Sequence, residues 1–107
     1  MTPTEFFTNR QWNDAFEDAN ATLLKENIIE IIRSVDGGCG GSTWVGIFRL
    51  DSAKFLFITA WHDWTYDGGE YRVCDTIEEI ARMYCTEEDR ERLGLQLNDP
   101  VLITQNP

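Results

Sequence analysis

The amino-acid sequence predicts an α+β fold: a long N-terminal helix packed on an antiparallel sheet of three to four strands, followed by two short C-terminal helices. Apolar residues recur at steps of three and four through the first third of the chain, which is the period of a helix. The middle third holds two β-branched and aromatic runs around a turn, and the last third holds two capping signals. The chain has 107 residues without a repeat or linker, so we expect a single domain over residues 1–107.

The predicted long helix covers residues 9–35. Thr2 and Thr8 each open a capping-box pattern, so a short first turn would lead into the longer helix. Asn20 is the position at which this helix could break in two, because Asn favours caps over helix interiors, and Gly37 supplies the stop. One continuous apolar stripe would run along the helix, formed by Trp12, Phe16, Ala19, Leu23, Leu24, Ile28, Ile31, Ile32 and Val35.

The middle of the chain predicts an antiparallel hairpin and a third strand. Residues 43–50 and 55–61 are rich in β-branched and aromatic side chains, and residues 51–54 form the turn between them. Both faces of these strands are apolar, so we expect the sheet to be covered on both sides. The long helix would cover one face, and the C-terminal helices or a second subunit would cover the other. Residues 67–69 then predict a turn and residues 70–74 a third strand.

Two short helices are predicted after the sheet. Thr76 and Thr86 are the expected N-caps, since each is followed three residues later by an acidic side chain. Gly94 is the expected stop of the second helix. Residues 101–104 are the candidate for a fourth strand at the sheet edge, with Pro100 before it where no ladder donor is needed.

The charge of the chain limits the partners that it can bind. There are 19 acidic and 9 basic residues, which gives a net charge of −10 at pH 7. Direct nucleic-acid binding and binding to anionic membranes are not expected, and a protein with a basic surface is the expected partner. The simpler interpretation is that this charge only keeps the protein in solution. Without an apolar run of about 20 residues or a signal-peptide pattern, we expect a cytoplasmic protein.

A cysteine nucleophile is the first catalytic candidate. Cys39 lies among four glycines, and His62 is the one histidine of the chain. However, a thiolate just after the C-terminus of a helix is disfavoured by the helix dipole. His62 and Asp63 would also point to opposite faces of a strand, which does not suit an acid that orients the imidazole. We therefore predict no catalytic residue, and a small-molecule-binding or hydrolytic pocket near Cys39 and His62 stays the alternative.

Metal, cofactor and paired-carboxylate chemistry is also not predicted. Cys39, His62, Cys74 and Cys85 could supply a Cys₃His zinc site, but they contain no Cys-x-x-Cys pair. A helix between Cys74 and Cys85 would hold them about 15 Å apart, too far for one tetrahedral site. The acidic pairs at residues 78–79 and 87–89 fall in first turns of helices, where the dipole favours them. No phosphate-binding glycine loop is present.

Residues 58–75 are the most unusual segment, because four aromatic residues lie there among His62 and several acids. Trp and Tyr are enriched at binding hot spots, so this segment predicts a contact patch for a partner. The alternative is that the large rings complete the core. The predicted patch consists of Trp61, Asp63, Trp64, Tyr66, Asp67 and Glu70, with Glu87 and Glu88 at its rim.

Residues 42–69 and 75–94 together resemble a group of small proteins encoded in phage and prophage genomes. The matching residues are Trp44-Val45-Gly46 in the first strand of the hairpin and Asp63-Trp64-Thr65 after the second. The similarity covers about the last two thirds of the chain and carries no catalytic residues. It implies an accessory protein of a mobile element that acts in the cytoplasm of the host cell. Such small acidic proteins often bind a host protein, as anti-CRISPR inhibitors do.

The leading hypothesis is a small acidic, non-enzymatic binding protein that acts by protein–protein interaction, in one form as an inhibitor of a basic, nucleic-acid-processing host defence enzyme. The second hypothesis is a small-molecule-binding or hydrolytic pocket near Cys39 and His62. A Cys39 thiol that reacts far faster than a free model thiol would favour this hypothesis. The third is a homodimeric accessory protein whose sheet face is its interface, which sedimentation as a dimer would favour.

Overall fold

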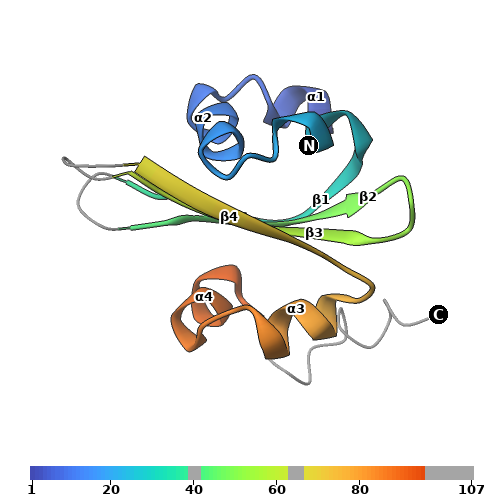
Figure 1. Ribbon diagram of the computed structural model, residues 1–107, viewed down its shortest axis with the longest axis vertical. Helices are drawn as coiled ribbons and strands as arrows, with labels where there is room; N and C mark the ends of the chain where they lie inside the picture. Colours follow the sequence, from blue (N-terminus) through green and yellow to red (C-terminus); the bar gives the residue numbers. More distant parts are fainter. Residues whose placement is uncertain (39–41, 63–66, 96–107) are drawn as a thin grey trace.

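A four-stranded antiparallel sheet forms the middle layer of the computed structural model, which describes residues 1–38, 42–62 and 67–95. The strands lie in sequence order: β1 (Ile28–Val35), β2 (Trp44–Leu50), β3 (Phe55–His62) and β4 (Asp67–Cys74). One face is covered by α1 (Pro3–Phe6), α2 (Arg10–Asp18) and the 3₁₀-helix η1 (Thr22–Asn27), and the other by α3 (Ile77–Met83) and α4 (Glu87–Leu93) (Figure 1). The result is a three-layer α+β arrangement of short helices on both faces of one sheet.

The long N-terminal helix predicted over residues 9–35 is wrong. The helix α2 ends at Asp18, and residues 28–35 form the edge strand β1. Asn20, the expected break, has a left-handed backbone with φ 60°, a conformation that interrupts a right-handed helix. The helix η1 then leads the chain into the sheet.

The apolar residues of 28–35 recur at a helical spacing because the strand β1 is irregular. The pairing of β1 with β2 shifts register twice, between Ile28 and Glu30 and between Ile31 and Arg33. These irregularities bring Ile28 and Ile31 to the same face, whereas a regular strand would place them on opposite faces. An apolar spacing of three therefore occurs without a helix, and the β-branched residues suit the strand.

The turn predicted at residues 67–69 is also wrong, because these residues begin β4 and pair with the end of β3. The two glycines make room on both faces. A Cβ on Gly68 would lie 2.7 Å from the Trp61 ring, and a Cβ on Gly69 would lie 3.1 Å from Ala19. The sheet has β1 as its fourth strand, formed by residues that were expected to be helical. The strand predicted at residues 101–104 lies outside the described residues.

The two faces of β2 and β3 build two separate cores, as the apolar strands predicted. The α2 face includes a cluster of aromatic rings in which Phe48 packs edge-on against Phe6, Trp12 and Phe16, with centroids 5.2–6.0 Å apart. The opposite core joins alternate strand residues to the C-terminal helices and includes Val45, Ile47, Phe55, Phe57, Ile77, Ile80 and Leu93.

The predicted caps of the C-terminal helices are confirmed. The hydroxyl oxygens of Thr76 and Thr86 accept hydrogen bonds from the backbone N–H groups three residues later, at 3.0 Å in both cases. Gly94 ends α4 with φ 71°, in the left-handed region that favours glycine. The Arg90 guanidinium also donates to the Ala81 and Cys85 carbonyls, which ties α4 to the end of α3.

Gly46→Ala should destabilise the fold by about 1–3 kcal/mol because it overpacks the α2-face core. A Cβ at this position would lie 2.7 Å from the Phe48 ring and 3.2 Å from the Trp12 ring. Urea denaturation followed by tryptophan fluorescence measures the change. Gly38→Ala is the matched control, since among the described residues no atom beyond Gly38 and its chain neighbours lies within 4 Å of a Cβ there. Equal midpoints for the two variants would contradict this account of the core.

Candidate binding groove

The sheet divides the predicted contact patch between its two faces. Trp61 and Glu70 lie on the side of α3 and α4, whereas Asp67 lies on the α2 side, where its Oδ1 pairs with Nδ1 of His62. This division follows from strand alternation, because neighbouring residues of β3 and β4 point to opposite faces. Three members of the predicted patch, Asp63, Trp64 and Tyr66, lie outside the described residues.

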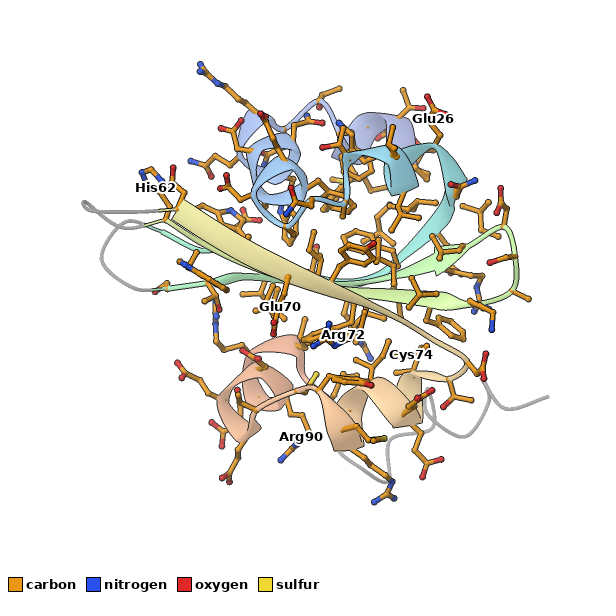
Figure 2. All side chains as sticks on the ribbon, viewed as in Figure 1. Glu26, His62, Glu70, Arg72, Cys74 and Arg90 are labelled. Atoms are coloured by element: carbon orange, nitrogen blue, oxygen red, sulfur yellow. The ribbon has the colours of Figure 1, made fainter. Side chains whose placement is uncertain are left out.

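The α4 face brings Trp61, Glu70 and Glu88 together at one groove of about 280 Å³. Figure 2 shows the Glu70 side chain extending from β4 toward α4. Glu87 begins α4 but does not line the groove. We call this hollow the α4 groove and define it by Trp61, Glu70, Tyr84, Glu88, Asp89 and Arg92.

Local features hold the parts of the α4 groove in place. The Trp61 ring lies over Gly68, where any larger residue would collide with it. The acids of α4 sit in its first turn, which begins at the Thr86 cap. The helix dipole and the cap therefore stabilise the first turn of α4, from which Glu88 and Asp89 line the groove.

Arg92 is the cation of the α4 groove, and its hydrogen bonds go to neutral groups. Its guanidinium donates to Oγ1 and the carbonyl of Thr43, at 2.9 and 2.7 Å, and to the carbonyl of Asp36 at 3.3 Å. These bonds tie α4 to the start of β2. Across residues 1–38, 42–62 and 67–95, no ion pair is formed by the groove carboxylates of Glu70, Glu88 and Asp89.

A tyrosine of the α4 groove already packs against a guanidinium of the chain. The Arg72 guanidinium lies over the Tyr84 ring, with its central carbon 5.4 Å from the ring centroid. Tyr84 remains 37% exposed, so part of its ring stays accessible to a second group. The groove thus combines aromatic surface with acidic side chains, which is a chemistry that suits cations.

The described cysteines do not suit nucleophilic chemistry. The pKa of Cys74 is raised to about 11 and that of Cys85 to about 12, chiefly by burial and in smaller part by nearby acids. Thiols in this state stay protonated near neutral pH. Among the residues with a described position, no group of three His, Cys, Asp or Glu side chains could hold a metal ion. Cys39 lies outside these residues, so the alternative pocket that uses it stays a prediction.

Sequence reasoning missed the role of two residues of the α4 groove. Tyr84 belongs to the apolar stripe of the α3 segment and therefore reads as a core residue. No pattern around Arg92 in the sequence predicts its hydrogen bonds, because its partners Thr43 and Asp36 are about 50 positions away in the sequence. The acids after Thr86 are visible in the sequence, but their direction toward Trp61 depends on how α4 packs.

The free energy of unfolding should fall as the pH rises from 9 toward 11. An unfolded cysteine ionises near its ordinary pKa of 9.0, whereas burial keeps Cys74 and Cys85 protonated in the fold. Their contribution is thus complete below pH 9 and lost as pH climbs toward the folded values. Urea denaturation at pH 8, 9, 10 and 11 measures it.

The matched control is a chain with both Cys74→Ala and Cys85→Ala. It should lose less stability than the parent between pH 9 and 11, whatever its absolute stability at pH 8. Parallel pH profiles for the two chains would show that these thiols are not buried as described.

No helix in the described part of the chain has the length and apolar character needed to cross a membrane. Comparisons with protein-family models, with curated proteins and with solved structures give no match to this chain. The resemblance to small phage and prophage proteins therefore has only the residues quoted above as its support.

Proposed function

We propose that this protein is a non-enzymatic binding protein that holds a basic segment of another protein in the α4 groove. The observation that carries the proposal is the composition of the groove: two aromatic rings beside three carboxylates that form no ion pair with the described cations. Side chains of this kind recognise Lys and Arg by cation–π contact and by charge-assisted hydrogen bonds.

The charge of the whole chain supports the same class of partner. A net charge of −10 attracts a basic surface over distances of about one Debye length, near 8–10 Å in physiological salt, and so speeds encounter. Trp61 and Tyr84 supply the rigid aromatic area that binding hot spots use. The groove carboxylates would repel a phosphate backbone, so the proposal concerns a basic protein and not a nucleic acid.

A nucleic-acid-processing enzyme of a host cell is the partner class that fits this chemistry best. Such an enzyme carries a basic groove for phosphates, and an acidic protein that fills this groove inhibits it. The phage or mobile-element origin, and with it the anti-CRISPR-like role, rests on the resemblance of residues 42–69 and 75–94.

The homodimer alternative depends on an apolar sheet face that needs a second subunit as its cover. In the described part of the chain, α1, α2 and η1 cover one face and α3 and α4 cover the other (Figure 1). A dimer is therefore not needed to bury the two faces of the β2–β3 hairpin.

A capped tetra-arginine peptide should bind the α4 groove, because it presents guanidinium groups without a folded surface of its own. In NMR titrations of the ¹⁵N-labelled chain, the Trp61 indole and the Glu70 and Glu88 amides should shift together. Glu70→Gln or Glu88→Gln should weaken binding about two- to fivefold, as expected for solvent-accessible ion pairs. High salt should weaken it further.

Glu26→Gln is the matched control, because it removes one negative charge on the opposite side of the sheet (Figure 2). It should leave the peptide affinity nearly unchanged. If Glu26→Gln weakens binding as much as Glu70→Gln, the peptide follows net charge alone and the α4 groove is not its site.

A further inference from the structure

The strand β4 forms an edge of the sheet and has a partner on one side. In the strand order β1-β2-β3-β4, it pairs with β3 and with no other described strand. Every second residue of an edge strand turns its backbone N–H and C=O groups outward, where they can pair with a further strand. Figure 1 shows β4 in front of the other strands, between the α2 layer and the α3–α4 layer. The outer edge of β4 is therefore a candidate for strand addition.

Two features distinguish β4 from β1, the strand at the other edge. The eight residues of β4 pair with β3 without a register shift, whereas β1 has two such irregularities. β4 also exposes two large side chains, since Tyr71 is 38% and Val73 is 44% exposed. Their cross-strand neighbours Ile58 and Leu56 belong to the α2-face core, so the exposed pair continues that core to the rim of the sheet. A regular edge with exposed apolar side chains favours association with another strand.

On its other face, β4 carries one acid and one base. Glu70 and Arg72 are two positions apart, and Figure 2 shows both side chains on the side of α3 and α4. Within the described part of the chain, neither side chain forms an ion pair. The Arg72 guanidinium stacks on Tyr84 and donates one hydrogen bond to the Tyr71 carbonyl, at 3.3 Å. Since a guanidinium has five N–H donors in one plane, others remain for a carboxylate.

We propose that β4 binds β4 of a second copy of this chain, antiparallel to it, about a two-fold axis through Tyr71. In such a pair, residues equally far before and after the axis lie opposite each other. Glu70 of each copy then faces Arg72 of the other, on the side of α3 and α4. On the α2 side, the two Tyr71 rings are neighbours, and the exposed Val73 of each copy faces Gly69 of the other, which leaves it room.

The charges of β4 favour a second copy over an unrelated strand, because they are complementary to themselves about Tyr71. An axis through Glu70 would place two carboxylates opposite each other, and an axis through Arg72 would do the same with two guanidinium groups. The net charge of −10 on each copy opposes association, but physiological salt screens it beyond about 8 Å, so the contacts along the strand decide the affinity. The contact uses the edge of the sheet and does not depend on the proposed function.

Sedimentation equilibrium of the full chain at physiological salt, from about 10 µM to about 1 mM, should show a monomer–dimer equilibrium. Glu70→Arg and Arg72→Glu should each weaken the dimer at least about tenfold, because the two-fold axis turns both ion pairs into like-charge pairs. Glu26→Arg is the matched control for Glu70→Arg, since it makes the same charge change on the opposite side of the sheet (Figure 2). It should change the dissociation constant by less than about twofold.

A mixture of the two variants tests the register directly. The Glu70→Arg chain carries two bases on this face of β4 and the Arg72→Glu chain two acids, so a mixed pair regains both opposite-charge contacts. An equimolar mixture should therefore form a heterodimer about as tight as the parent dimer, although each variant alone is mainly monomeric. The proposal is overturned if the parent stays monomeric up to about 1 mM, if Glu70→Arg dimerises like the parent, or if the mixture stays monomeric. These measurements contain no peptide, so a failure of the proposed function would not affect them.

Discussion

The fold depends on one constraint: the β2–β3 hairpin is apolar on both faces. Val45 and Ile47 point to one side of the sheet, and Trp44 and Phe48 point to the other. Exposing either set to water would forfeit about 1.5–3 kcal/mol for each large side chain, so both faces need a cover. The segment before β1 supplies one layer of short helices, and the segment after β4 supplies the other (Figure 1).

This three-layer arrangement places two hollows on opposite faces of the sheet. Trp61 and His62 are adjacent in the sequence, yet Trp61 lines the α4 groove and His62 lines a hollow beside α2 on the opposite face. Glycines at the start of β4 leave room on both faces at this end of the sheet, since the Trp61 ring lies over Gly68 and Ala19, at the end of α2, lies against Gly69. The same few residues thus shape the α4 groove on one face of the sheet and the hollow beside α2 on the other.

Much of the fold could be predicted where local chemistry decides the structure. The hairpin follows from its β-branched runs, and the Thr76 and Thr86 caps follow from their side chains. The N-terminal helix was mispredicted because two register shifts in β1 imitate a helical spacing. The sites could be predicted less well: Trp61, Glu70 and Glu88 were found as residue types, but their meeting with Tyr84 and Arg92 depends on tertiary packing.

The two irregularities in β1 affect how this strand behaves at the edge of the sheet. An edge strand exposes a row of backbone N–H and C=O groups that can template pairing with a further chain. The register shifts at Ile28/Glu30 and Ile31/Arg33 interrupt the even spacing of that row, and charged side chains lie at both places. A second strand could therefore not form a continuous ladder along β1, which guards an isoleucine-rich segment against amyloid-like stacking.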